Sequence, residues 1–243
     1  MSGKISRFPW KPILGVWMTL FIVLGISLPM VPQPQHWYDL PLIPGLEERA
    51  RNIFFHVPSA WLSAIGFIAS LVYGIRYLRR KEPLDDIRSA SAASLGLLFC
   101  IIATVTGAIW AKFNWGTFWN WDPRETSIFV LLLIYGAYFA LRSAVDGEEK
   151  RATLSAVYSI VAGVVMPFFL FILPRITSGL HPGSADDTNM GPAVSSGGMD
   201  AKMRVLMYGS FFGFVGLYYW MWTLQVKVSR LDTWLTEHGG SGD

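Results

Sequence analysis

Six stretches of the chain contain no charged side chain, and this pattern constrains the fold more than any other feature. Each stretch is 16 to 23 residues long, close to the roughly 20 apolar residues that a helix needs to cross the hydrocarbon core of a bilayer. The 20 Lys and Arg residues and the 17 Asp and Glu residues all lie outside them. A soluble enzyme, a secreted disulfide scaffold and a disordered chain are therefore excluded. The stretches are 13–31, 53–75, 89–110, 126–141, 153–173 and 205–225.

The fourth stretch is the shortest, and the residues before it lengthen the helix that it forms. The run Asp122-Pro123-Arg124-Glu125 has an aspartate, a proline and a glutamate in the positions that a capping box requires. A helix over 123–141 spans about 28 Å. We therefore predict an all-α polytopic membrane protein with one six-helix domain, 1–243. Its spans are about 13–31, 53–75, 89–110, 123–141, 153–173 and 205–225.

The basic residues predict the side of the membrane on which each loop lies, because Lys and Arg are enriched in cytoplasmic loops. The two terminal segments and loops 76–88 and 142–152 hold 13 of the 20 basic residues, against 7 in loops 32–52, 111–125 and 174–204. Both termini are therefore predicted to be cytoplasmic. The three longer loops are predicted to lie on the outer side.

Cysteine content and net charge exclude several kinds of function. The single cysteine, Cys100, lies in the third stretch, so an intrachain disulfide, a CxxC pair and a CxxCH haem-attachment site are all excluded. The net charge of +3 is spread among the loops, and no basic block indicates binding to nucleic acid. The long outer loops are instead the candidates for function, since structureless loops of such length are usually functional or disordered.

The second outer loop carries the most informative sequence of the chain. Four of the eleven tryptophans fall between Trp110 and Trp121, in a run that also holds Gly116 and Asn120. An interfacial aromatic belt explains single tryptophans near helix ends, and that alternative stays open here. A flat apolar ligand explains the cluster better, because indole faces stack on large π-systems and Gly116 lets the backbone approach closely.

The charged residues at the end of this loop differ in how they are explained. The capping box indicates that the main role of Asp122 and Glu125 is to begin the helix that follows. Arg124 is different, because a cation is unfavourable at a helix N-terminus. A ligand carboxylate would account for Arg124, as would snorkelling of its side chain toward the interface.

Two of the four histidines are predicted to lie at the outer face. His56 stands at the outer end of the second span, and an ionisable group at membrane depth indicates function. A neutral histidine bonded to a backbone carbonyl is an equal alternative for it. His181 lies in the third outer loop. His36, in the first outer loop, has no evident partner, and His238 lies in the polar tail.

Two imidazoles, an aromatic platform and an arginine on one face suit an iron porphyrin. Imidazole nitrogens ligate haem iron axially, aromatic rings cover the macrocycle, and cations meet the propionates. Two histidines alone are too few for a closed tetrahedral zinc site. Haem is therefore the ligand that fits best, with His56 and His181 as the candidate iron ligands.

The run WGTFWNWDPRET at 115–126 resembles the tryptophan-rich signature of haem-handling membrane proteins. Six spans, the chain length and the run His-Val-Pro-Ser-Ala-Trp at 56–61 resemble, within that superfamily, the cytochrome c maturation protein C family. The resemblance implies that His56 and His181 are axial ligands of a transiently bound haem b. It also implies an aromatic platform that supports the porphyrin, and it offers one residue, less strongly supported than the histidines, for contact with a haem propionate. The platform is Trp115, Gly116, Trp119, Trp121 and Asp122, and the propionate candidate is Arg124.

The same resemblance implies partners and a location. The family is expected to hold haem at the outer face of the cell inner membrane and to pass it to a periplasmic haem chaperone of the CcmE type. An ABC-type complex that releases the loaded chaperone, a small single-span helper subunit and membrane lipid are the other implied partners. No nucleophile or acid–base pair is evident, so an enzyme is not predicted.

Three alternatives stay open. The Trp-Asp-Pro-Arg-Glu run also resembles the larger haem-transfer proteins of the other cytochrome c assembly system. A permease subunit of an ABC transporter would carry ionisable groups at mid-membrane, and the six stretches hold none apart from His56 near an outer end. A scaffold subunit without its own haem site would be purified without a chromophore.

Cysteine labelling tests the topology. In a chain whose Cys100 is replaced by Ala, single cysteines introduced at Ser184 and at Asp146 are expected to react from opposite sides of the membrane, because their loops differ in basic charge. Reaction of both positions from the same side would contradict the six-span topology and the shared outer site.

Overall fold

The computed structural model of the protein describes residues 9–43, 45–181, 183–185 and 199–238, and it is a bundle of long helices. Lys4 and Arg7 of the predicted inner terminus, and residues 186–198 of the third outer loop, lie outside this part of the chain. Two short strands, β1 (Met30–Val31) and β2 (Leu40–Pro41), pair in parallel. The helices are α1 (Trp10–Ser27), η1 (Glu47–Asn52), α2 (Ile53–Arg80), α3 (Pro83–Trp115), α4 (Pro123–Ala144), α5 (Glu148–Pro167), η2 (Phe168–Ile172), α6 (Leu173–Ile176) and α7 (Ala201–His238).

Five helical segments in the described part of the chain are long and apolar enough to cross a membrane. They are α1, α3, α4, the continuous η1–α2 segment and the continuous α5–η2–α6 segment. An all-α fold is therefore confirmed, and its five candidate membrane helices are consistent with a polytopic membrane protein. α7, which contains the sixth charge-free stretch, is outside this set, since eight Gly, Tyr and Trp residues over 205–225 lower its mean hydropathy. The sixth span stays a prediction.

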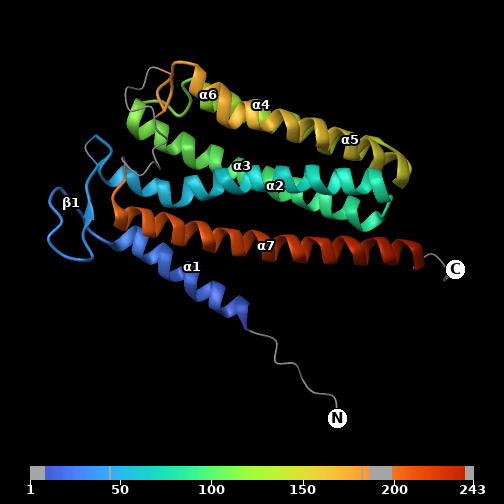
Figure 1. The fold of residues 1–243 in the computed structure, drawn as a ribbon, viewed down its shortest axis with the longest axis horizontal. Helices are drawn as coiled ribbons and strands as arrows, with labels where there is room; N and C mark the ends of the chain where they lie inside the picture. Colours follow the sequence, from blue (N-terminus) through green and yellow to red (C-terminus); the bar gives the residue numbers. More distant parts are fainter. Residues whose placement is uncertain (1–8, 44, 182, 186–198, 239–243) are drawn as a thin grey trace, which may run out of the picture.

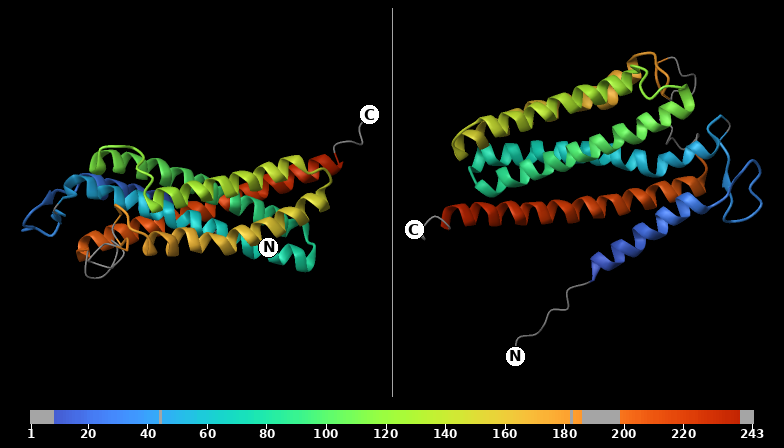
Figure 2. Two further views of the ribbon diagram at one scale, coloured as in Figure 1. Left: turned by 90° about the horizontal axis from the view of Figure 1, so that it is seen from above. Right: turned by 180° about the vertical axis from the view of Figure 1, so that it is seen from behind.

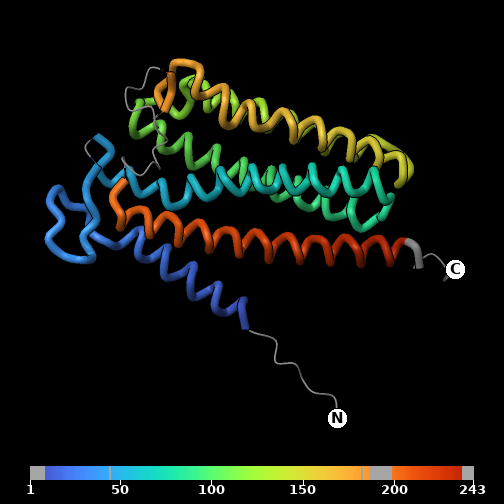
Figure 3. The backbone as a smooth tube through the Cα atoms, in the orientation of Figure 1, coloured from blue at the N-terminus to red at the C-terminus, as the bar shows by residue number. Residues whose placement is uncertain are grey.

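The helices follow one another across the bundle from α1 to α7, then to α2 and α3, and then to α4 and α5 (Figure 1 and Figure 2). α2 is the central helix, because it packs against α3, α5 and α7. The end of α3, the starts of α2, α4 and α7, and the two strands gather at one end of the bundle (Figure 3). The three predicted outer loops therefore share one end, and the end of α7 lies at the other.

Small residues join the central pair of helices. A Cβ added to Gly66 of α2 would lie 2.7 Å from the Cα of Gly96 and 2.9 Å from the carbonyl oxygen of Ala92, both on α3. Such close backbone approach is typical of membrane helices, which associate through van der Waals packing of small residues. Beside this contact, Phe67 stacks on Tyr135 of α4, with ring centroids 3.5 Å apart. The positions of α2 and α3 are thus fixed by backbone contact.

Ion pairs join the helices at the end opposite the outer loops. Asp86 of α3 accepts two hydrogen bonds from the guanidinium of Arg142 on α4, at 2.7 and 2.9 Å. Asp85 lies 3.3 Å from Arg76 of α2 and 3.4 Å from Arg88. Both aspartates are buried, and a buried carboxylate is stable only when it is paired. The pairs hold α2, α3 and α4 together near the predicted inner loops.

The structure differs from the sequence analysis at three places. α3 continues through residues 111–115, assigned above to the outer loop, because these five residues include no Pro or Gly. Gly116 ends α3 with a φ of +86°. α7 runs to His238, well beyond the predicted end at 225. His36 has a partner after all, since its Nδ1 lies 3.1 Å from Oδ2 of Asp39.

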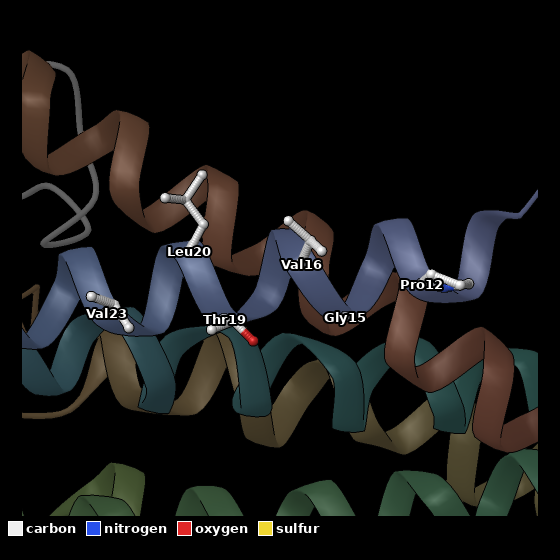
Figure 4. Close-up of a pocket in the computed structure, with 6 residues that line it drawn as sticks. All are labelled: Pro12, Gly15, Val16, Thr19, Leu20 and Val23. Carbon is white, nitrogen blue, oxygen red and sulfur yellow. The ribbon is translucent and has the colours of Figure 1, made fainter.

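A shallow apolar groove of about 570 Å³ runs along one face of α1 (Figure 4). Its side chains are largely exposed, with Val16 71% accessible. An apolar face of this kind suits contact with lipid tails. The groove shares no lining residue with the predicted site. It is lined by Pro12, Gly15, Val16, Thr19, Leu20 and Val23.

Replacing Gly66 by Val tests the contact between α2 and α3. The variant is expected to lose about 1–3 kcal/mol of stability, because the added carbon atoms meet backbone atoms of α3. Gly136→Ala is the matched control, since a Cβ at Gly136 has no neighbour within 4 Å. Thermal unfolding in detergent should show a lower midpoint for Gly66→Val only. Equal midpoints for the two variants would contradict the close packing.

Candidate functional site

The carboxylate of Asp122 joins the start of α4 to the segment that follows α6. Its Oδ1 accepts a hydrogen bond from the backbone N–H of Arg124 at 2.9 Å and lies 2.7 Å from Nδ1 of His181. Its Oδ2 accepts a hydrogen bond from the backbone N–H of Leu180 at 2.6 Å. The Asp122 side chain is 1% exposed. The second and third outer loops are thus connected through one buried side chain.

Asp122 is ionised in this setting. Burial alone would raise the pKa of Asp122, but the hydrogen bond with His181, together with the N–H groups of Arg124 and Leu180, lowers that pKa to about 2. The carboxylate is therefore only an acceptor at neutral pH. The contact also depends on Gly179, because a Cβ there would lie 2.7 Å from Oδ2 of Asp122.

The predicted capping box at the start of α4 is confirmed. Asp122 accepts from the N–H of Arg124, and Oε2 of Glu125 accepts from the backbone N–H of Asp122 at 3.3 Å and of Asn120 at 2.6 Å. Trp121, between them, has a φ of +55°, which is uncommon for a bulky residue. The capping contacts on either side stabilise this strained turn.

The tryptophans around the second outer loop divide into two groups. Trp110 and Trp115 lie against His181, with ring centroids 6.2 and 4.7 Å from the imidazole. Trp119 and Trp121 instead pack against Phe129 of α4, at 6.3 Å each. Trp121 is 69% exposed. The first group borders a candidate ligand, whereas the second forms a partly exposed aromatic surface.

His56 lies near the start of α2 and faces the last turns of α3. Its Nδ1 is 3.1 Å from Oγ1 of Thr106, and a Cβ added to Gly107 would lie 2.9 Å from its Cε1. Gly107 therefore leaves the space that the His56 ring fills. Thr106 and Trp110 are four residues apart, on one face of α3. That face contacts His56 through Thr106 and His181 through Trp110.

The structure brings the two candidate ligands to one place. His56 lies beside Thr106 of α3, and His181 lies beside Trp110, one helical turn further along α3. Trp115, the last residue of α3, and Asp122, which caps α4, contact His181 directly. Gly116, predicted to admit a ligand, has a conformational role as well, since its left-handed φ ends α3.

Thr106 and Gly107 were not connected with this site from the sequence, and Trp110 was included only in the tryptophan cluster. All three lie near the outer end of the third span, and their spacing puts them on neighbouring positions of one helix face. That spacing was a usable signal. It could not show which face of the third span meets His56, because spacing along one helix does not identify the residues of other helices that pack against it.

The donor set of the described residues suits haem iron better than a bare metal ion. Within residues 9–43, 45–181, 183–185 and 199–238, no group of three His, Cys, Asp or Glu side chains could hold a metal ion. Zinc takes at least three protein ligands, whereas haem iron takes only axial ligands from the protein. Two imidazoles bordered by indole rings therefore fit haem.

The family model described as heme exporter protein C, CcmC, matches residues 7–236 of the chain. The chain belongs to this family. The heme exporter protein C of Paracoccus denitrificans is 34% identical over 166 residues, which are 68% of this chain and 67% of that protein. A ccmC-like mitochondrial protein of cytochrome c biosynthesis from Marchantia polymorpha is 30% identical over 182 residues, 75% of each chain. The heme exporter protein C of Escherichia coli K12 is 32% identical over 166 residues, 68% of this chain and 64% of that protein. The resemblance inferred from the tryptophan run is confirmed.

Replacing Asp122 by Ala tests its role as the connection between the loops. The variant leaves the N–H of Leu180 without its acceptor and is expected to make local opening of the segment 177–185 easier by about 2 kcal/mol. Hydrogen exchange should show faster exchange of the Leu180 amide. Unchanged protection of that amide would contradict the contact.

Proposed function

We propose that this protein holds haem b at the outer face of the cell inner membrane and delivers it to a periplasmic haem chaperone during cytochrome c maturation. The observation that carries the proposal is the arrangement of His56 and His181. Both lie at the same end of the bundle, and each has its Nδ1 beside a polar partner. Imidazoles oriented in this way are typical of metal ligands. Membership in the heme exporter protein C family supports the same function.

His56 and His181 would hold the iron, and when bound the haem would supply a metal centre with two axial positions. Trp115 and Trp110 would border the ring on the side of His181, since they already contact that imidazole. Trp119 and Trp121 would extend the platform. Indole rings suit this role because they offer large, rigid apolar faces.

Gly116, Asp122 and Arg124 would complete the site. Gly116 has no neighbour within 4 Å of an added Cβ, so a flat ligand could approach the backbone there. Arg124 would meet a propionate, as a charge-assisted hydrogen bond to a carboxylate favours arginine. Asp122 would act through His181, which it contacts.

Transfer requires a surface on which a soluble partner can dock. Trp121 and Phe118 are 69% and 58% exposed on the loop between α3 and α4, and exposed aromatic side chains are enriched at protein interfaces. We assign this surface to the periplasmic chaperone. An ABC-type release complex and a small single-span helper subunit would act from the membrane-embedded faces. Handover needs a ligand set that can release the haem, so binding would be transient.

The proposal includes six spans with both termini cytoplasmic. α7 has 38 residues and would be about 57 Å long, more than enough to cross a hydrocarbon core of roughly 30 Å. Its start lies with the outer loops and its end with the predicted inner loops (Figure 1). The excess of basic residues in the inner segments supports this orientation.

Substitution of the two histidines tests the iron site. His56→Gly and His181→Gly are each expected to convert a low-spin, six-coordinate haem spectrum to a high-spin one, because one axial ligand is lost. Added imidazole should enter the vacant position and restore the low-spin bands. Absorption spectra of the purified variants measure both effects.

His36→Gly is the control, since His36 pairs with Asp39 in the first outer loop. Its spectrum should match that of the unsubstituted protein. A low-spin haem in His181→Gly without added imidazole would contradict the paired-histidine site, although haem binding itself could stand.

A further inference from the structure

The polar partner of His181 determines which nitrogen of its ring carries the proton. Asp122 receives hydrogen bonds from the backbone N–H groups of Arg124 and Leu180, an arrangement that only an acceptor can satisfy. Nδ1 of His181 lies 2.7 Å from Oδ1 of the same carboxylate. Nδ1 must therefore be the donor, and in the neutral imidazole this leaves the lone pair on Nε2, where it is available to a metal.

The partner of His56 leads to the same tautomer by a different route. Thr106 has one hydroxyl proton. Its Oγ1 donates this proton to the carbonyl oxygen of Ile102, 2.8 Å away, or to the carbonyl oxygen of Ala103, 3.2 Å away. With its proton used, the Thr106 hydroxyl oxygen can only accept a further hydrogen bond. Nδ1 of His56, 3.1 Å away, is then the donor. In the neutral ring, donation from Nδ1 leaves the lone pair of His56 on Nε2, and Gly107 leaves room for the ring beside α3.

The two partners differ in strength. A hydrogen bond to a carboxylate is shorter than one between neutral groups and roughly twice as strong, and the distances, 2.7 Å for His181 and 3.1 Å for His56, follow this order. A carboxylate behind a ligating histidine also raises the basicity of the ligand. A neutral hydroxyl fixes the ring but adds little negative charge.

We infer that Thr106 and Asp122 are unequal positioning residues, which fix both histidines with Nε2 free but make His181 the stronger iron ligand and His56 the weaker one. This inference rests on the proposed function. A site that passes haem on needs an order of release, and an unequal pair supplies one. His56 would release the iron first, while His181 would keep the haem beside Trp110 and Trp115 until transfer.

The tautomers can be measured without haem. The full-length, haem-free protein in detergent, labelled with ¹⁵N at its histidines, should show His56 and His181 protonated at Nδ1 in long-range ¹H–¹⁵N spectra at pH 8. Assignment follows from His36→Gln and His238→Gln variants, which remove the other two signals. A proton on Nε2 of either candidate ligand overturns the inference. This result does not depend on whether the protein binds haem.

The inequality is measured in the haem-loaded protein with variants of the two carboxylates at the start of α4. Asp122→Asn offers one oxygen to three donors, so it cannot keep every contact. It is expected to shift the haem reduction midpoint to a more positive potential and to speed haem loss to apomyoglobin by about 10-fold or more. Glu125→Gln is the matched control, because Glu125 completes the same capping box without touching His181.

The control separates tuning of the ligand from capping of the helix. Equal midpoint shifts in Asp122→Asn and Glu125→Gln would mean that Asp122 acts only on the helix, and would overturn the inference. Thr106→Val, which removes the hydroxyl with little change of shape, should shift the midpoint less than Asp122→Asn does. A larger shift in Thr106→Val would reverse the assigned order. A protein that takes up no haem would instead refute the proposed function and leave the tautomer result intact.

Discussion

The buried carboxylate of Asp122 is the contact on which the geometry of the outer end depends. It begins α4, and it accepts hydrogen bonds from Arg124, Leu180 and His181. Through the last two contacts, it attaches the segment after α6 to the start of α4. One side chain therefore caps a helix and orients a candidate ligand, because both tasks need a hydrogen-bond acceptor at the same point.

The membrane explains why such a site can be built on so few polar residues. In hydrocarbon the backbone must satisfy its own hydrogen bonds, which favours long helices, and small residues such as Gly66 and Gly96 allow them to approach closely. α2 and α3 are fixed in this way where Gly66 meets Gly96. His56 and Thr106, near their outer ends, are consequently held in place by a rigid pair of helices rather than by a loop.

The sequence was sufficient to predict the helices and the residues that share one end, since charge-free stretches and basic loops follow directly from bilayer thickness and charge. It also predicted the capping box at Asp122, a local pattern. It did not predict the hydrogen bond between Asp122 and His181, 59 residues apart, because spacing carries no information on tertiary neighbours. For the same reason it grouped all the tryptophans, whereas Trp115 borders His181 and Trp119 packs on Phe129.

The central claim is that two histidines at the outer end hold haem, and the spectrum of the unsubstituted protein tests it most directly. Full-length protein purified in detergent from haem-replete cells should show the absorption and electron paramagnetic resonance signals of low-spin, six-coordinate haem with two imidazole ligands. A purified protein without haem would contradict the proposed function. A high-spin, five-coordinate spectrum would contradict the pairing of His56 with His181.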